Sequence, residues 1–428
     1  MTERTIKVDA LARVEGEGAL HVRLKGDRIE ELHFRIFEPP RYFEALLQGR
    51  PAADAPDITS RICGICPVAY IMGASEAVED ALGVRITPEI AALRRLIYCG
   101  EWIQSHVLHA AMLHAPDFLG LDDAMSIAQV EPELVRTALR LKKIGNRLME
   151  VIGGRAVHPV NTRIGGFFAA PDPEDIAALI PELDWGAEAA RDLAVAFARF
   201  DFPEAEGDYT FVSLAQPETY PILEGRIGSS AGLDIAKAEF GDVFAESQVP
   251  HSTALHAHMA GAPYMVGPLA RYANNFARLP EVCRHTAQEA GLGPVERNPF
   301  KSILVRMIEV QYACLEGARL ARAYNAPDPP HVEAPPRAGE GHGCTEAPRG
   351  ICHHAYGLDA GGRIEWARIV PPTSQNQPQI EVDLARVVQA NLALTDDALR
   401  HRCEQTIRNY DPCISCATHF LKLEIERG

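Results

Sequence analysis

The sequence predicts an α+β protein that is mostly α, with a core of long bundled helices and a small antiparallel sheet near the N-terminus. Apolar and polar residues alternate between positions 5 and 37, whereas most later segments show helical spacing. The 428 residues are 47% hydrophobic and 23% charged, which is typical of a folded protein and excludes collagen-like and disordered classes. We expect one domain over 1–428, with an N-terminal β region (1–40), a mainly helical core (41–330) and a C-terminal region (331–419).

The expected elements follow in order along the chain. Gly16, Gly18 and Gly26 punctuate the alternating stretch and predict two or three antiparallel strands. A short helix after Arg41 should end at Gly49. A strand is expected at 363–370, and the Pro- and Gly-rich stretch 325–343 is expected to be a loop. Further helices are predicted at 74–82, 90–114, 131–152, 172–198, 302–326, 395–410 and beyond Cys413.

Charge and hydropathy argue against two classes of partner. Lys and Arg number 42 and Asp and Glu number 58, so the net charge of −16 repels nucleic-acid phosphates and anionic lipids. No apolar run reaches the roughly 18 residues that a transmembrane helix needs. The N-terminal stretch lacks the apolar segment of a signal peptide. We therefore expect a cytoplasmic protein with reduced thiols, no nucleic-acid partner and no transmembrane segment.

Four of the ten cysteines form two C-x-x-C pairs, Cys63/Cys66 and Cys413/Cys416, which are candidate metal-binding motifs. A tight turn brings both thiols of such a pair to one side, where they can bind one metal. Four thiolates would complete a soft-ligand site for zinc, iron–sulfur or another thiophilic metal. A structural zinc site is an alternative, although zinc ribbons usually place their pairs about 15–20 residues apart. A redox dithiol is a further alternative.

Seven ordered elements, which include both cysteine pairs, resemble the large (alpha) subunit of nickel–iron hydrogenases. The closest class is the cytoplasmic, bidirectional, NADP-linked one, which includes sulfhydrogenases. The elements are Arg13-Val-Glu15-Gly16; Phe43-Glu44 with Gly49-Arg50; Arg61-Ile-Cys63-Gly-Ile-Cys66; Ser105-His106-Val-Leu-His109 with Asp117; Gly153-Gly-Arg155 with His158-Pro159 and Gly165-Gly166; Glu346-Ala-Pro348-Arg349-Gly350; and Asp411-Pro-Cys413-Ile-Ser-Cys416-Ala-Thr-His419.

The resemblance implies a hydrogenase-like fold and a catalytic subunit that splits dihydrogen reversibly into protons and electrons. All four cysteines would bind nickel, and Cys66 and Cys416 would also bridge to an iron that carries carbonyl and cyanide ligands. A side-chain base alone cannot deprotonate dihydrogen, whereas a Lewis-acidic metal pair makes heterolytic cleavage accessible. Cys413 would be the first base, and Glu15 would accept the proton next.

The resemblance also implies residues that surround the iron ligands. Arg349, which follows Pro348, would lie over the open metal site and donate to a cyanide. The carboxylates of Asp117 and Asp411 would hold this arginine. The segment with Thr373 and Ser374 resembles one that hydrogen-bonds the other cyanide.

A second metal site is implied near the C-terminus. Glu44, the backbone carbonyl of Ile369 and the imidazole of His419 occupy its motif positions, and magnesium (or iron) would bind there. One position departs from the family pattern, because Tyr70 stands where many members have histidine. A role that depends on histidine titration is therefore in doubt at that position.

The implied partners are an iron–sulfur small subunit, flavin and iron–sulfur diaphorase subunits for NAD(P), nickel-insertion proteins and a maturation endopeptidase. The endopeptidase would remove residues 420–428 after His419. Gly339-Glu-Gly341-His-Gly343 lacks a preceding strand and is not read as a dinucleotide fingerprint. Three alternatives stay open: a dihydrogen-sensing regulatory subunit, a subunit of the respiratory NADH dehydrogenase type, and a non-catalytic four-cysteine zinc protein. The intact cysteine pairs argue against the second.

Overall fold

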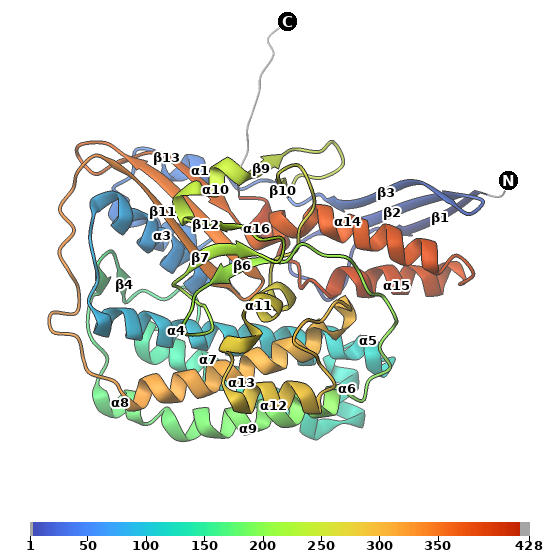
Figure 1. Cartoon of the computed structure of the whole chain (residues 1–428), viewed down its shortest axis with the longest axis horizontal. Helices are drawn as coiled ribbons and strands as arrows, with labels where there is room; N and C mark the ends of the chain where they lie inside the picture. The colour runs from blue at the N-terminus through green and yellow to red at the C-terminus, as the bar shows by residue number, and fades with distance from the viewer. Residues whose placement is uncertain (1–2, 420–428) are drawn as a thin grey trace, which may run out of the picture.

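A computed structural model describes residues 3–419 and has long helices on one side and β-containing layers on the other (Figure 1). The predicted α+β, mostly α class is confirmed. In the helical layer, α4 packs against α7 and α13, and α13 packs against α9. A continuous apolar core extends from Ile6 to Ala417. The helices of this layer are α4 (Pro88–Val107), α7 (Pro132–Gly153), α9 (Ile180–Phe197) and α13 (Ser302–Arg322).

Two glycines allow α4 and α7 to approach closely. A Cβ placed at Gly145 would lie only 2.5 Å from the carbonyl oxygen of Gly100, so neither helix tolerates a side chain at the crossing. The helix predicted at 90–114 is confirmed up to Val107, and its last 7 residues, Leu108–His114, differ because they form a π-helical turn. The chain continues into α5 (Ala115–Leu119) and α6 (Ala124–Val130).

The N-terminal sheet is an antiparallel meander of three strands, as the alternating pattern predicts. It extends to one side of the molecule and is covered by two late helices, α14 against β3 and α15 against β1 (Figure 1). Helix α14 escapes sequence prediction because its first half carries buried amides and an internal Pro378 instead of an apolar stripe; the amides are Gln375, Asn376, Gln377 and Gln379. The elements are β1 (Glu3–Val8), β2 (Gly18–Lys25), β3 (Arg28–Ile36), α14 (Pro372–Ala390) and α15 (Asp396–Arg408).

A second antiparallel sheet, in the order β11-β12-β13, packs on helix α3 (Pro67–Leu82). The expected loop is wrong at 339–343, because these residues begin strand β11. Their glycines face α3, where a Cβ at Gly339 would lie 2.5 Å from the carbonyl oxygen of Ala81. The glycines therefore permit strand-on-helix contact, and the following element is a strand, not the helix of a dinucleotide site. The strands are β11 (Gly339–Ala347), β12 (Gly350–Leu358) and β13 (Ile364–Val370).

Shorter elements connect these layers. The predicted helix at 172–198 is interrupted at Ala178 and Leu179, although Asp172 caps its start by accepting a hydrogen bond from Glu174 N–H. Within residues 3–419, no helix is long and apolar enough to span a membrane. The connecting elements are α1 (Phe43–Leu47), α2 (Ala55–Ser60), β4 (Thr162–Arg163), β5 (Gly166–Phe167), α8 (Pro173–Ala177), β6 (Val212–Ala215), β7 (Arg226–Ser229), β8 (Asp234–Ile235), α10 (Phe240–Val243), β9 (Phe244–Ser247), β10 (His256–Met259), α11 (Pro268–Asn275), α12 (Glu281–Glu289) and α16 (Ile414–Ala417).

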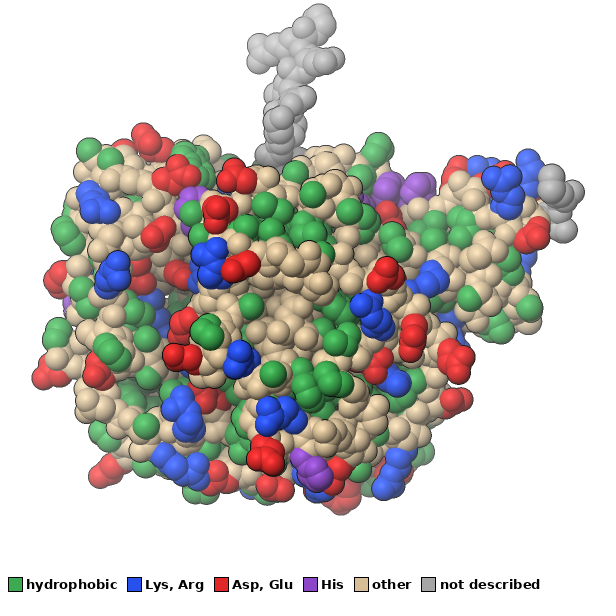
Figure 2. Space-filling view, viewed as in Figure 1, with side chains coloured by type: hydrophobic (Ala, Val, Ile, Leu, Met, Phe, Trp, Pro, Cys, Tyr) green, Lys and Arg blue, Asp and Glu red, His purple; other side chains and the backbone are tan. Residues whose placement is uncertain are grey.

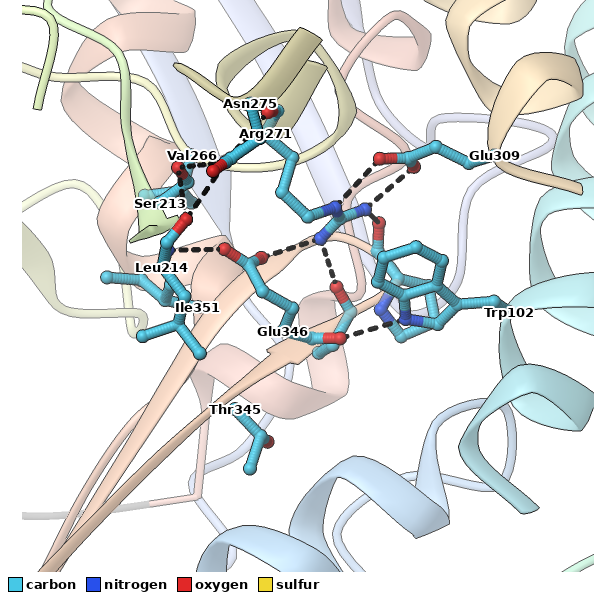
Figure 3. Close-up of polar contacts among 12 residues, drawn as sticks. Trp102, Ser213, Leu214, Val266, Arg271, Asn275, Glu309, Thr345, Glu346 and Ile351 are labelled. Atoms are coloured by element: carbon cyan, nitrogen blue, oxygen red, sulfur yellow. Dashed lines mark hydrogen bonds and ion pairs between the residues drawn. The ribbon is translucent and has the colours of Figure 1, made fainter. Parts of the chain in front are cut away.

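A fully buried arginine joins three helices to strand β11 (Figure 3). Arg271 of α11 donates through Nε and Nη2 to the two oxygens of Glu309 on α13, each at 2.8 Å. Its Nη1 donates to Glu346 of β11 at 2.7 Å, and its guanidinium lies 4.3 Å from the ring centre of Trp102 on α4. Burial works against ionisation of Glu309, but Arg271 outweighs burial and lowers the pKa of this carboxyl.

The same guanidinium fixes the turn after β11. Arg271 Nη1 donates to the carbonyl oxygen of Ala347 at 2.7 Å, and Nη2 donates to that of Pro348 at 2.9 Å. The indole Nε1 of Trp102 donates to the carbonyl oxygen of Glu346 at 2.9 Å. These bonds set the position of the backbone that carries Arg349.

We expect Arg271→Met to lower the free energy of unfolding by about 3–5 kcal/mol, because Glu309 and Glu346 would stay buried without their cation. Urea unfolding followed by circular dichroism measures the change. Arg400→Met is the control, since Arg400 and Asp397 are 2.7 Å apart with side chains 48% and 86% exposed. The control should cost less than about 1 kcal/mol. Equal losses in the two variants would contradict the structural role of Arg271.

Candidate metal centre

The two cysteine pairs, from opposite ends of the chain, meet in the interior. Cys63 and Cys66 lie just before α3, and Cys413 and Cys416 enclose the start of α16. The Sγ atoms of Cys63 and Cys413 are 3.3 Å apart, and those of Cys66 and Cys416 are 3.7 Å apart. All four sulfurs lie within 4.8 Å of one another and are buried. This is the tight group of soft ligands that a thiophilic metal requires.

Backbone bonds hold the C-terminal pair in place. Glu15 and Cys413 form a short parallel β-bridge, in which Ile414 N–H donates to the carbonyl oxygen of Glu15 at 3.0 Å. The N–H of Cys413 donates to Thr373 Oγ1, in the first turn of α14, at 3.1 Å. The N-terminal segment and α14 therefore both position the second cysteine pair.

The four thiols do not ionise equally. Hydrogen bonds from Cys413, Cys416 and Cys66 lower the pKa of Cys63, whereas burial raises the pKa of both Cys413 and Cys416. Four neighbouring thiolates would repel one another in this buried place. A bound cation removes that penalty, and its binding would release protons from the thiols.

Arg349 supplies positive charge beside the sulfurs and contributes, after the neighbouring thiols, to the lowered pKa of Cys63. Its Nε and Nη2 donate to the backbone oxygen and Oδ1 of Asp411, at 2.6 and 3.0 Å. Within residues 3–419, its buried Nη1 has no hydrogen-bond partner, and neither has the buried Oγ of Ser374. Because buried donors without acceptors are costly, this environment suits a metal centre with small acceptor ligands such as cyanide.

The prediction that Asp117 holds Arg349 is wrong. The carboxylate of Asp117 pairs with Arg13 and accepts two hydrogen bonds from Arg408, at 2.7 and 2.9 Å. Asp117 lies in α5, directly after the π-helical turn. From this position its carboxylate contacts Arg408, the last residue of α15. Asp117 therefore anchors the helix that leads into the second cysteine pair, while Asp411 alone of the two contacts Arg349.

Glu15 reaches from the N-terminal segment to the metal centre. The thiol of Cys413 donates to Glu15 Oε2 at 3.1 Å, and Ser415 N–H donates to the same oxygen at 3.0 Å. Glu15 is half-buried, and the next two residues, Gly16 and Glu17, are exposed. A carboxylate thus stands between a buried sulfur and the surface, where it can relay a proton.

The three groups predicted for the second metal also come together. His419 Nε2 lies 2.6 Å from the carbonyl oxygen of Ile369 and 3.6 Å from Glu44 Oε1. Glu44 Oε1 also accepts a hydrogen bond from Ile369 N–H at 2.7 Å. A fourth residue of this group, Glu246 on β9, was not predicted from the sequence. Burial raises the pKa of the Glu246 carboxyl to about 7, and His419 and Glu44 lie close enough to affect it. Its irregular, Gly- and Pro-rich surroundings gave no periodic signal.

A second missed residue is Glu101, which lies in α4 behind the first cysteine pair. It accepts hydrogen bonds from the N–H groups of Val68 and Ala69, at 2.6 and 3.1 Å, at the start of α3. Burial raises its pKa well above the ordinary value. The available signal was a carboxylate inside an otherwise apolar helical stretch, from Leu96 to Ile103.

Comparison with known proteins gives a consistent result. Residues 41–138 and 257–419, which contain both cysteine pairs, match the family described as nickel-dependent hydrogenase. Sulfhydrogenase 1 subunit alpha of Pyrococcus furiosus is 32% identical over 423 residues, 98% of each chain. The NAD-reducing hydrogenase HoxS subunit beta of Cupriavidus necator is 26% identical over 98% of this chain and 95% of its own.

Solved structures agree with this result. The crystal structure of an NAD⁺-reducing [NiFe]-hydrogenase in the H2-reduced state aligns with a TM-score of 0.86 and 26% identity, over 97% of this chain and 99% of the other. Given these matches and the four converged cysteines, the chain belongs to the nickel-dependent hydrogenases and is a nickel–iron large subunit of the sulfhydrogenase class, an oxidoreductase that acts on dihydrogen.

Proposed function

We propose that this subunit cleaves dihydrogen reversibly, relays the proton through Glu15 and passes electrons to an iron–sulfur small subunit and on to NAD(P). The observation that carries the proposal is the contact of Cys413 Sγ with Glu15 Oε2 at 3.1 Å, inside a group of four buried sulfurs. This contact joins the expected metal ligands to a base that reaches toward the surface.

The proposed ligand set follows from the donor chemistry. Cys63, Cys66, Cys413 and Cys416 would hold nickel, with Cys66 and Cys416 shared with iron. When bound, the metal pair supplies the Lewis acidity that splits dihydrogen heterolytically. The remaining roles belong to side chains that hold the iron ligands: Arg349 Nη1 and Ser374 Oγ would donate to cyanide nitrogens, with Pro348 and Thr373 lining the same place.

The protein itself moves the proton. The Cys413 thiolate would accept it first, and Glu15 Oε2 would take it next across the existing hydrogen bond. The N–H of Ser415 holds that oxygen toward the sulfur, so the carboxylate needs no rearrangement to receive the proton. Glu15 is itself half-buried and is followed by the exposed Gly16, so the proton can pass from this carboxylate to solvent without a further side chain.

Electrons need a partner chain. Among residues 3–419, the four converged thiols are the one group of cysteines compact enough to hold a metal. The other six cysteines are buried but do not belong to any such group. Arg61 and Gly64, on either side of Cys63, are exposed. An iron–sulfur protein that covers this surface would come close to the metal centre.

An apolar surface supports that docking place. His158 Nδ1 lies 2.8 Å from the carbonyl oxygen of Ser60, which brings the segment 157–168 next to the first cysteine pair. Its exposed apolar side chains are Val157, Val160 and Phe168, with exposures of 49%, 48% and 62%. Such grouped apolar exposure is typical of a protein interface. The NAD-reducing relative supports diaphorase partners beyond the small subunit, and a cytoplasmic location stays a prediction.

Glu44, Ile369 and His419 would hold magnesium or iron, with Glu246 as a further oxygen ligand. Nickel-insertion proteins would load the main centre, and an endopeptidase would then cut after His419. The expected maturation peptide, 420–428, lies outside the described residues.

Measuring sustained turnover distinguishes a hydrogenase subunit from a subunit that only senses dihydrogen. The purified complex should reduce NAD(P)⁺ or an artificial acceptor steadily under dihydrogen. Dihydrogen binding without sustained turnover would favour the sensor instead.

We expect Glu15→Gln to keep the nickel and iron content but to slow dihydrogen/deuterium exchange by about 10²-fold or more, because the amide cannot accept the proton. Mass spectrometry of the evolved gas measures the exchange. Glu17→Gln is the matched control, an exposed carboxylate two positions away, and should exchange normally. A normal rate in Glu15→Gln would remove Glu15 from the relay.

Phe168→Asp should weaken copurification of the iron–sulfur partner by about tenfold or more, because a charge would enter an apolar interface. The metal content of the large subunit should not change. Met125→Asp in α6 is the control, since Met125 is 73% exposed at a distant place. If both variants retain the partner equally, the docking surface lies elsewhere.

Cleavage after His419 predicts that the metal-loaded chain is lighter than the metal-free chain by residues 420–428. Intact-mass spectrometry of both forms gives the answer directly. A metal-loaded chain that still ends at Gly428 would refute cleavage.

A further inference from the structure

Three ligating side chains meet outside the cysteine centre, where the β9–β10 loop reaches the N-terminal sheet. His33 comes from β3, His251 from the loop and Glu381 from α14, and each offers one ligand atom within 4.8 Å of the other two. His251 Nε2 lies 2.8 Å from Glu381 Oε1. The rings of His33 and His251 are stacked with centroids 4.4 Å apart. Residues far apart in sequence thus present nitrogen and oxygen ligands to one point.

The elements that carry these side chains are fixed by other bonds. Glu381 Oε1 also accepts a hydrogen bond from Phe34 N–H on β3 at 3.0 Å. Thr253, two residues after His251, donates through its N–H and Oγ1 to the carbonyl oxygen of Ile36, at 2.9 and 3.1 Å. The loop, the strand and the helix are therefore held together before any ligand binds, which lowers the entropic cost of binding.

The local charges suit a cation. Burial, and then the charge of His251, lower the pKa of His33. Glu381 and Glu31 face the same histidine, while His21 adds a further imidazole nearby. The side chains of His251 and Glu381 are 20% and 21% exposed. Figure 2 shows histidine side chains at the surface in this region, so an ion in solution can reach them.

We propose that His33, His251 and Glu381 form a second transition-metal site, which takes Zn²⁺ with water in the fourth position. Two imidazoles and one carboxylate are a common zinc set, whereas magnesium and calcium prefer mainly oxygen ligands. The ion would replace the direct contact of His251 Nε2 with Glu381 Oε1. It ties the β9–β10 loop and the N-terminal sheet to α14, whose first turn bears Thr373 at the cysteine centre.

Zinc titration of the nickel-loaded protein tests the site. The wild-type protein should bind one more zinc than His251→Ala or His33→Ala, each of which should bind that ion at least about tenfold more weakly. Zinc should also raise the melting temperature of the wild type but not of the two variants. Equilibrium dialysis with elemental analysis and thermal unfolding measure these effects.

His258→Ala is the matched control, because His258 is a partly exposed histidine on β10 outside the ligand group. It should bind zinc as the wild type does. Any zinc held by cysteines is common to all four proteins and cancels in the comparison. Equal nickel content and circular dichroism show that each variant folds. Equal zinc affinity in the wild type, His251→Ala and His33→Ala would overturn the proposal, as would the lack of the additional zinc in the wild type.

Discussion

The convergence of four buried sulfurs is the constraint on which the rest of the structure depends. Because they lie within 4.8 Å of one another, they can all be anionic only with a cation among them. The protein places Arg349 beside them, and Glu15 Oε2 accepts a hydrogen bond from the thiol of Cys413. The site therefore combines four metal-binding sulfurs with an adjacent carboxylate, and both ends of the chain must fold to complete it.

The surrounding helices hold this arrangement through buried charge and close packing. Arg271 fixes the backbone before Arg349, and the pair of Asp117 with Arg408 fixes the helix before the second cysteine pair. Strand β11 reaches α3 at backbone distance because Gly339 carries no side chain. Since each contact joins segments remote in sequence, the centre is rigid without a disulfide: all ten cysteines are free thiols.

Local pattern predicted the elements with clear periodicity and the residues within motifs. The N-terminal strands and most long helices follow from spacing, and the four cysteines, Glu15 and the group around His419 follow from motif resemblance. What failed depends on long-range contact. The start of strand β11 was predicted as a loop because of its glycines, which in fact allow the strand to pack closely on α3. Asp117 binds Arg408 in place of Arg349. Glu101 and Glu246 are recognisable only once burial and their distant neighbours are known.

Elemental analysis of the purified chain, combined with infrared spectroscopy, would show whether the four cysteines hold a nickel–iron centre. We expect equimolar nickel and iron at the four cysteines, with infrared bands from carbonyl and cyanide ligands that Arg349 and Ser374 surround. Zinc without nickel at the cysteine centre, and a spectrum without those bands, would contradict this expectation.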